Sequence, residues 1–224
     1  MILDLYRDSR LDLLELGRTL SEDQAATLSP ACPAWTVKDL YAHQAGVAAD
    51  VLAGRLDGVA TAPWADRQVA ERADWTLGEV LDEWERNGPE LEDRLADVGD
   101  AVDPRLVLDV WTHGQDVRGA LDRPARRDGP VAQWCTQSMV ARFGSRLREA
   151  GLAPLTLDVG HEELTAGGDR AADTLAVSRF ELLRAATGRR SRSQILAWAW
   201  PSGPSAYVDA LTVFPPRATP LDEG

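Results

Sequence analysis

Two histidines and one aspartate interrupt otherwise apolar helical stripes, and their types are those of metal ligands. Asp109 and His113 stand four residues apart in PRLVLDVWTHGQDVRGAL. Residues at that spacing on a helix have Cβ atoms about 5 to 6 Å apart, so both side chains can reach one point in front of the helix. A catalytic zinc takes three protein ligands and keeps one position open. This helix therefore offers two of the three ligands.

The third ligand must come from elsewhere in the chain. His43 lies in WTVKDLYAHQAGVAADVL, again in the middle of an apolar helical stripe, whereas His161 stands among glutamates and is expected to be exposed. If the two inward faces meet, His43, Asp109 and His113 form a two-histidine, one-carboxylate site inside a helical bundle. The alternative is a self-satisfied pair, in which a buried His113 only donates a hydrogen bond to Asp109.

Capping signals predict where the helices that position these residues begin. Thr36 is followed by Asp39, and Thr76 by Glu79, at the spacing of a capping box. The first pair places His43 in the second turn of its helix. Apolar periodicity marks five helical segments, at 3–20, 37–54, 77–95, 104–121 and 131–150. Their short connections predict an antiparallel bundle, with 58–73 as a loop that covers a pocket.

The pattern changes after Gly151. Residues 155–159 alternate between apolar and polar, which is typical of a strand, and HEELTAGGD resembles a second strand. Helical patterns follow at 178–186 and in SRSQILAWAW. We therefore predict an α+β protein with a boundary near residue 150: a helical bundle over 1–150 and a small α/β domain over 151–224.

Composition narrows the classes of partner. The 224 residues carry a formal net charge of −12, and ATGRRSR is the one basic cluster, which argues against binding a nucleic-acid backbone. No apolar run approaches the length of a membrane span, and MILDLYRDSR lacks the basic start of a signal peptide. Two unclustered cysteines exclude a disulfide framework. We expect a cytoplasmic protein, monomeric or homodimeric, that binds small molecules.

Two motifs resemble those of a known family. CPAWTVKDLYAHQAG and DVWTHGQDVRGALDRP are similar to the metal-binding segments of the mycothiol-dependent maleylpyruvate isomerase family, whose bundle is DinB-like, and the tail from GRRSRSQILAWAW onward resembles its C-terminal region. The resemblance implies a divalent metal, usually zinc, held by His43, Asp109 and His113. The family's carboxylate is typically glutamate. Aspartate is one methylene shorter, so its oxygen would fall about 1 Å short unless the helices shift.

The resemblance also implies a chemistry that uses mycothiol as the thiol cosubstrate. Zinc lowers the pKa of a bound thiol, and the thiolate adds to the cis double bond of maleylpyruvate, permits rotation and leaves to give fumarylpyruvate. Other members are similar to thiol transferases. Asp116 is a candidate to orient a ligand imidazole or accept a proton, with a structural role as the alternative. Arg217, Arg189 and Arg190 are candidates to bind ligand carboxylates, with an ordinary surface role as the alternative.

Two further hypotheses belong to other classes. A binding or regulatory module could keep the bundle and sense a thiol or small ligand without catalysis, and Asp109 in place of glutamate favours this one. A metal-free biosynthetic enzyme could also have been built on the same fold. Metal analysis and thermal stability with mycothiol, measured beside turnover, distinguish the three.

Overall fold

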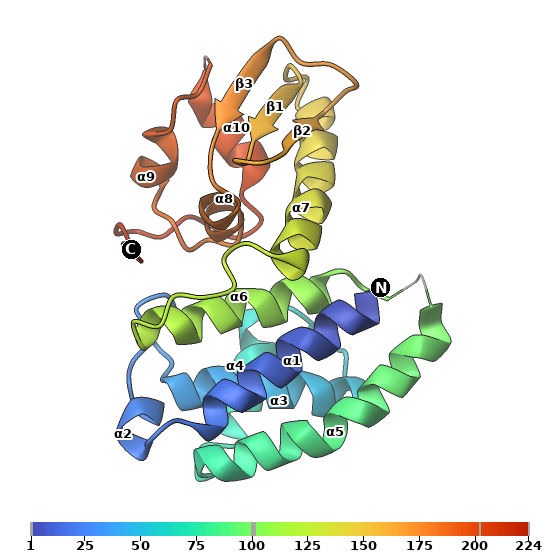
Figure 1. The fold of residues 1–224 in the computed structure, drawn as a ribbon, viewed down its shortest axis with the longest axis vertical. Helices are drawn as coiled ribbons and strands as arrows, with labels where there is room; N and C mark the ends of the chain where they lie inside the picture. The colour runs from blue at the N-terminus through green and yellow to red at the C-terminus, as the bar shows by residue number, and fades with distance from the viewer. Residues whose placement is uncertain (1, 100–101, 202, 224) are drawn as a thin grey trace. The chain divides into compact units, whose positions relative to one another are not determined.

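The structure is a computed structural model that describes residues 2–99, 102–201 and 203–223. Its contacts divide the chain into two compact units, 1–125 and 126–224, and each is described by itself. The first unit is helical and the second combines helices with a small sheet (Figure 1).

Four long helices build the first unit. They are α1 (Ile2–Arg18), α3 (Val37–Ala53), α5 (Leu77–Val98) and α6 (Arg105–Ala120). In the ring that they form, α1 packs against α5 and α6, and α3 packs against the same two helices. Figure 1 shows that α3 and α5 run in the same direction, whereas α1 and α5, and likewise α3 and α6, are antiparallel. A chain that links parallel neighbours must return along the bundle, and residues 54–76 do so.

Two of the predicted capping boxes define the helix starts. The Thr36 side chain accepts a hydrogen bond from the Asp39 backbone N–H, and the Asp39 carboxylate accepts one from the Thr36 backbone N–H. Thr76 and Glu79 make the same reciprocal pair at the start of α5. Such a cap typically contributes about 1 kcal/mol to helix stability. Both predicted starts are confirmed, and His43 lies in the second turn of α3.

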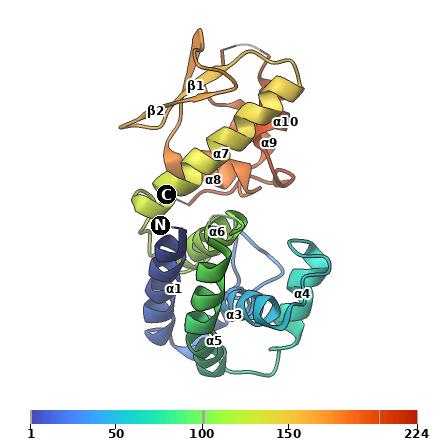
Figure 2. The same cartoon turned by 90° about the vertical axis from the view of Figure 1, so that its right-hand side faces the viewer.

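The stretch between α3 and α5 differs from its prediction. Residues 62–70, predicted to be part of a loop, form α4 (Ala62–Ala70), with Pro63 in the first turn, where its missing N–H costs nothing. This helix packs on α3 outside the ring (Figure 2). The segment lacks an aliphatic stripe, because the residues it buries are Trp64 and Gln68. Apolar periodicity therefore gave no helical signal here. A short α2 (Glu22–Ala25) precedes α3.

The second unit surrounds a three-stranded sheet of order β2-β1-β3. Strands β1 (Leu155–Asp158) and β2 (Glu163–Ala166) pair antiparallel, with Leu155 opposite Ala166. Strand β3 (Asp173–Ala176), which the sequence did not predict, lies parallel to β1. The helices of this unit are α7 (Pro130–Glu149), α8 (Arg179–Ala186), α9 (Arg192–Leu196) and α10 (Pro204–Leu211).

The two compact units divide about 25 residues earlier than the predicted boundary near residue 150, because α7 belongs with the sheet. It packs against β2, α8 and α10. Gly144 permits this approach, since a Cβ there would lie 2.5 Å from the backbone nitrogen of Gly167. The helical pattern of α7 resembles that of the bundle helices, so its partner could not be identified from periodicity.

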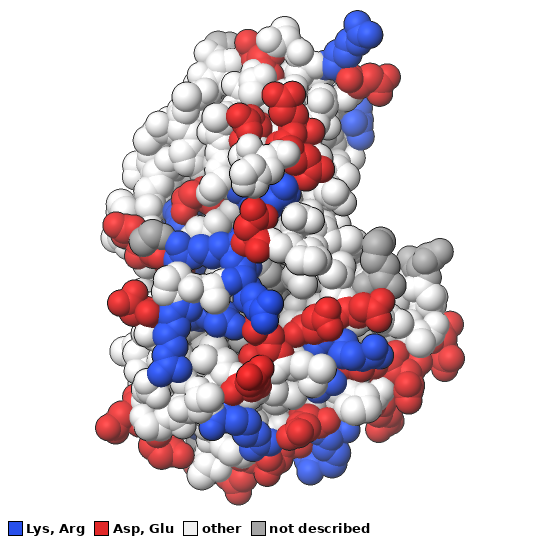
Figure 3. Space-filling view, in the orientation of Figure 1, with Lys and Arg blue, Asp and Glu red and all other residues white. Residues whose placement is uncertain are grey.

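The fold class is as predicted: a helical bundle followed by a small α/β part. Figure 3 shows acidic and basic side chains interspersed over the bundle. Exposed ion pairs of the bundle include those of Arg18 with Asp82 and Glu85. Among the described residues, every helix is too short or too polar to cross a bilayer.

Candidate metal centre

The three predicted ligands lie together inside the first unit. Helix α3 carries His43, and α6 carries Asp109 and His113. The His43 Nε2 atom is 3.5 Å from Oδ2 of Asp109, and the His113 Nε2 atom is 3.6 Å from Oδ1 of the same carboxylate. The imidazole rings lie edge to face with centroids 4.9 Å apart. One ligand atom from each residue lies within 4.8 Å of the others.

These distances suit a shared cation better than direct hydrogen bonds. Ligand atoms about 2.0 to 2.1 Å from a tetrahedral zinc are roughly 3.3 Å from one another, which is close to the separations found here. Hydrogen bonds from N–H to oxygen are shorter, at about 2.7 to 3.2 Å. The short hydrogen bond of His113 goes to Asp116 and not to Asp109. Each of the two Asp109 oxygens lies within 3.6 Å of one Nε2 atom.

The remaining nitrogen of His113 has its own partner. Its Nδ1 atom is 3.0 Å from Oδ2 of Asp116, a carboxylate with no exposed surface. The Cys32 thiol donates to the same oxygen at 3.4 Å. A carboxylate accepts but does not donate, so the shorter contact, to Asp116, favours the neutral tautomer with its proton on Nδ1 and its Nε2 lone pair on the side of Asp109.

His43 is held in the same orientation by a different group. Its Nδ1 atom is 2.7 Å from Oε1 of Gln68 on α4. The amide of Gln44, the next residue on α3, donates to Oδ2 of Asp109 at 2.7 Å. In both imidazoles, Nδ1 contacts a hydrogen-bonding side chain and Nε2 faces the Asp109 carboxylate. Histidines that bind metals are usually oriented in this way, by a hydrogen bond from the ring nitrogen that does not bind the metal.

Charge in the cluster is set for binding a cation. Burial of Asp109 opposes its ionisation, but the imidazoles of His113 and His43 and the amide of Gln44 outweigh it and keep the pKa of Asp109 well below its usual range. Burial lowers the pKa of His113, with Asp109 and Asp116 acting in the opposite direction. Near neutral pH the cluster therefore offers a carboxylate and a neutral His113 ring, the protonation states of metal ligands.

Aromatic side chains border the two imidazoles. The ring of Trp35 lies 5.3 Å from that of His43 and 5.9 Å from that of His113, and Trp64 approaches His43 edge-on at 6.3 Å. The imidazole side chains are 5% and 10% exposed, whereas that of Asp109 is 35% exposed. Solvent therefore reaches the cluster at the carboxylate.

The other predicted site residues have different surroundings. Arg189, Arg190 and Arg217 belong to the second unit, where Arg189 and Arg217 are half-buried. Arg190 is buried and pairs with Glu181 at 2.5 Å and with Glu223 at 2.7 Å. Their role in binding ligand carboxylates stays a prediction.

Arg190 belongs to an arginine cluster of the second unit, which also contains Arg127, Arg184 and their carboxylate partners Glu181 and Glu223. Arg184, with no exposed surface, donates to both carboxylate oxygens of Glu223 at 2.6 and 2.8 Å. Arg127 donates to the backbone carbonyl of Glu223. The guanidinium carbons of the three arginines lie 4.2 to 5.8 Å from the centroid of one ring, Phe180.

Sequence reasoning missed the supporting residues of the metal centre. Gln44 and Cys32 carried no periodic signal, although each lies within the segments that carry the motifs. Gln68 could have been found by one feature: it stands four residues after Trp64, so the two share a face of any helix formed there. Arg67 and Arg55 both pair with the buried carboxylate of Asp50.

Comparisons with known proteins find a matching family model and a similar solved structure. The model of the mycothiol maleylpyruvate isomerase N-terminal domain matches residues 6–126, more than half of the chain. The chain is also similar to a crystal structure of a histidine-to-alanine mutant of the mycothiol-dependent maleylpyruvate isomerase. The identity is 15% and the TM-score 0.51, over 84% of this chain and 88% of that one, so the likeness shows the fold. No curated protein matches in sequence.

Proposed function

Because this chain belongs to the mycothiol maleylpyruvate isomerase N-terminal domain family, we propose that it is a metal-dependent enzyme that uses mycothiol on a small electrophilic metabolite. The observation that carries the proposal is the orientation of the two imidazoles. Both Nε2 atoms face the Asp109 carboxylate at 3.5 and 3.6 Å, while Asp116 and Gln68 occupy the Nδ1 positions. A self-satisfied polar core has no need for this convergence.

The donor set fits zinc. Two imidazole nitrogens and one carboxylate oxygen are a ligand set of catalytic zinc sites, which keep a fourth position for water or substrate. When bound, zinc would hold the mycothiol sulfur as a thiolate and lower its pKa. The residues of the chain supply the rest. Asp109 contributes the negative charge, Asp116 and Gln68 orient the rings, and Trp35 and Trp64 keep water from the imidazoles.

The reaction proposed for the activated thiol is cis-trans isomerisation. The thiolate sulfur forms a bond to one carbon of the cis double bond of maleylpyruvate, and the π electrons move onto the conjugated carbonyl. Rotation then occurs about the resulting single bond. The C–S bond breaks as the electrons return, which releases the trans product and the thiolate. In the related S-transfer, the carbanion formed by the addition takes up a proton from water, and the resulting thioether is released as the product. Both use the same activated sulfur, so the metal centre alone does not choose between them.

Metal analysis combined with turnover tests the proposal. Protein purified without chelators should contain close to one zinc per chain, and it should isomerise maleylpyruvate in the presence of mycothiol. Removing the metal should abolish turnover, and adding zinc should restore it. Full activity in metal-free protein would contradict the proposal and favour the metal-free enzyme. Stabilisation by mycothiol without turnover of any electrophile would instead favour a binding module.

A further inference from the structure

Helix α4 buries a polar residue where a packing helix would bury an aliphatic one. Gln68 has no exposed surface, and with Trp64 it makes up the buried face of this nine-residue helix. Both residues approach His43: Trp64 through its ring and Gln68 through its amide oxygen. A buried amide must have its hydrogen bonds satisfied, so its partners indicate why it lies there.

The facing side of α3 is shaped to receive Gln68. His43, Gly46 and Asp50 follow one another at spacings of three and four residues, so they share one face of the helix. A Cβ at Gly46 would lie 2.5 Å from Cβ of Gln68 and 2.7 Å from its Cγ. Any larger residue would push Gln68 away from α3. Gly46 thus opens the space in which Gln68 reaches His43 on one side and Asp50 on the other.

The orientation of the Gln68 amide follows from Asp50. Its carboxylate, with no exposed surface, accepts from Gln68 Nε2 at 2.7 Å, from Arg55 Nε at 2.6 Å and from Arg67 Nη2 at 2.8 Å. Burial of Asp50 opposes ionisation, but these three donors outweigh it and lower the pKa of Asp50. An ionised carboxylate can only accept, so Gln68 must present its NH₂ group to Asp50 and its oxygen to His43.

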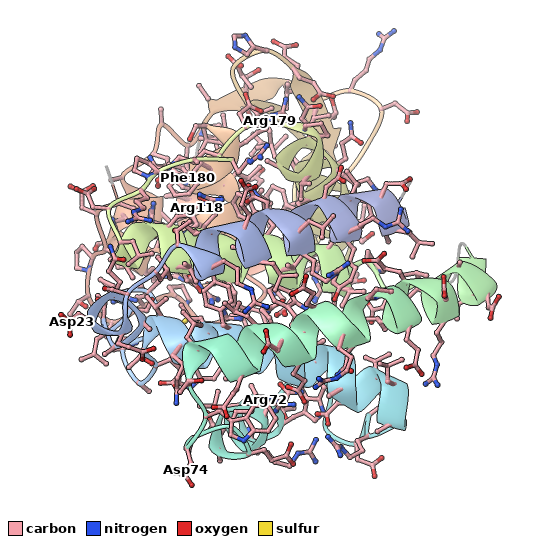
Figure 4. All side chains as sticks on the ribbon, turned by 60° about the horizontal axis from the view of Figure 1, so that its bottom comes forward. Asp23, Arg72, Asp74, Arg118, Arg179 and Phe180 are labelled. Atoms are coloured by element: carbon pink, nitrogen blue, oxygen red, sulfur yellow. The ribbon has the colours of Figure 1, made fainter. Side chains whose placement is uncertain are left out.

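A charged residue, Arg72, also holds α4 in place. Arg72, just beyond α4, donates to the Gln68 backbone carbonyl at 2.9 Å and binds both carboxylate oxygens of Glu83 on α5. Figure 4 labels Arg72 in this region, beside α5. The Gln68 backbone is therefore fixed from α5 while its side chain is fixed from α3.

We propose that Gln68 is a positioning residue that holds His43 in its Nδ1–H tautomer, and that Asp50 acts one step further away by fixing which end of the Gln68 amide faces the ring. A ring protonated on Nδ1 keeps its Nε2 lone pair toward Asp109. The consequence for metal binding rests on the proposed function, whereas the tautomer of His43 does not.

The two histidines thus have different partners for a physical reason. His113 is paired with a carboxylate, Asp116, and Asp109 already adds a second negative charge to the cluster. A carboxylate in the place of Gln68 would add a third. The neutral amide transmits the orientation set by Asp50 but leaves the charge of Asp50 with Arg55 and Arg67. A matched exchange of amide and acid can therefore test the arrangement.

The experiment compares the wild type with Gln68→Leu, Asp50→Asn, Gln68→Glu and the exchange variant that combines the last two. In the exchange variant, the carboxylate introduced at position 68 accepts from His43 Nδ1–H and from the amide introduced at position 50, so His43 keeps an acceptor at Nδ1. Long-range ¹H–¹⁵N NMR of the histidine rings in metal-free protein reports the tautomer of His43. Competition with a chromophoric chelator reports zinc affinity.

We expect His43 to be protonated on Nδ1 in the wild type and in the exchange variant. In Gln68→Leu and Asp50→Asn the ring should populate the Nε2–H form, and zinc affinity should fall roughly 10- to 100-fold, as is usual for loss of a ligand's hydrogen-bond partner. Gln68→Glu alone should also weaken zinc binding, because its carboxylate faces that of Asp50. The exchange variant should regain most of the lost affinity.

Other results would overturn the inference. An Nε2–H tautomer in the wild type, or the same tautomer in wild type, Gln68→Leu and Asp50→Asn, would contradict it. The inference would also be contradicted if the exchange variant is folded by circular dichroism but binds zinc no more tightly than its parent single variants. If the wild type shows the Nδ1–H tautomer and binds no zinc, the proposed function fails and the inference about His43 holds. If Gln68→Leu does not fold, the comparison of the exchange variant with its parent single variants still tests the inference.

Discussion

Two of the polar clusters among the described residues, one in each unit, differ in their internal distances. In the arginine cluster of the second unit, guanidinium nitrogens contact the carboxylates of Glu181 and Glu223 at 2.5 to 2.8 Å. In the metal centre of the first unit, the imidazole Nε2 atoms stay 3.5 and 3.6 Å from the Asp109 oxygens. One cluster brings opposite charges into contact, and the other directs three electron-pair donors toward one point.

This difference separates a structural network from a binding site. In the arginine cluster each of those contacts joins a donor to an acceptor, so the network stabilises the fold without a ligand. In the candidate metal centre the Nδ1 atoms of the two rings face Gln68 and Asp116, and their Nε2 atoms face the Asp109 carboxylate. Removing a residue from the first kind of cluster should cost stability, whereas removing one from the second should cost affinity for a cation.

The largest expected effect follows removal of an imidazole. His43→Ala and His113→Ala should each lower zinc affinity by more than about 100-fold, because loss of a ligand costs more than the 10- to 100-fold typical of loss of a supporting residue. Elemental analysis after purification without chelators measures this loss. His161→Ala, which changes an exposed histidine of the second unit, is the matched control and should keep its metal. Metal retained by both single variants would place the cation elsewhere.

The converse change breaks the arginine cluster. Arg184→Met leaves the Glu223 side chain, 4% exposed, without its bidentate partner, and should destabilise the second unit by about 3 to 5 kcal/mol. Arg192→Met, which removes an exposed pair with Asp209, should cost less than about 1 kcal/mol. Urea unfolding measures both. The zinc content at low temperature should be unchanged in both variants. If Arg184→Met also loses zinc, the two clusters do not have the separate roles that we assign to them.

A smaller effect is expected at the carboxylate. Asp109→Glu keeps the charge and adds one methylene. Because the Asp109 side chain is only half-buried, we expect room for it, so zinc should still bind within about tenfold of the wild-type affinity. Asp109→Asn removes the negative charge that attracts the metal ion, so this variant should bind zinc more weakly than Asp109→Glu. Isothermal titration of metal-free protein with zinc ranks the zinc affinities of the wild type, Asp109→Glu and Asp109→Asn. Equal affinities for glutamate and asparagine would show that position 109 is not a ligand.

The smallest expected difference between the units is in the chemical reactivity of their thiols, Cys32 in the first unit and Cys135 in the second. Burial raises the pKa of Cys135 to about 12, so at pH 8 roughly one molecule in ten thousand carries its thiolate. Cys32 is half-buried in the first unit. A thiol-specific reagent should therefore modify one thiol per native chain, and both after unfolding. Cys32→Ser should leave the native protein unreactive, and a remaining fast reaction would show that Cys135 is accessible.

The three residues that converge in the candidate metal centre could be predicted from the sequence, because polar residues in an apolar helical stripe stand out against a known period. His43, Asp109 and His113 were identified in this way, and the Thr36 cap fixed the turn on which His43 lies. Gln68 was not identified, because α4 lacks the apolar stripe that makes a helix recognisable, and its spacing from Trp64 is informative only once a helix is assumed there. Its packing depends on Gly46 and Asp50 of another helix, which are distant in sequence.

The limits of the domain prediction have a similar cause. Helix α7 has the same periodicity as a bundle helix, and only the approach of Gly144 to Gly167 shows that its apolar face meets the sheet. Strand β3 has four residues, of which only Leu175 is buried, so alternation gave too short a signal. Both depend on partners far along the chain, which a local pattern does not specify.

The parallel course of α3 and α5 has a consequence for how the protein can be damaged. The return stretch that it requires begins with residues 54–61, which are exposed and include Gly54 and Gly58 in left-handed conformations. A protease that nicks the chain there would leave the four long helices intact but release the start of α4. We expect limited digestion to yield a protein that keeps its bundle and melts near its normal temperature but holds the proposed zinc less tightly, because Gln68 on α4 contacts His43.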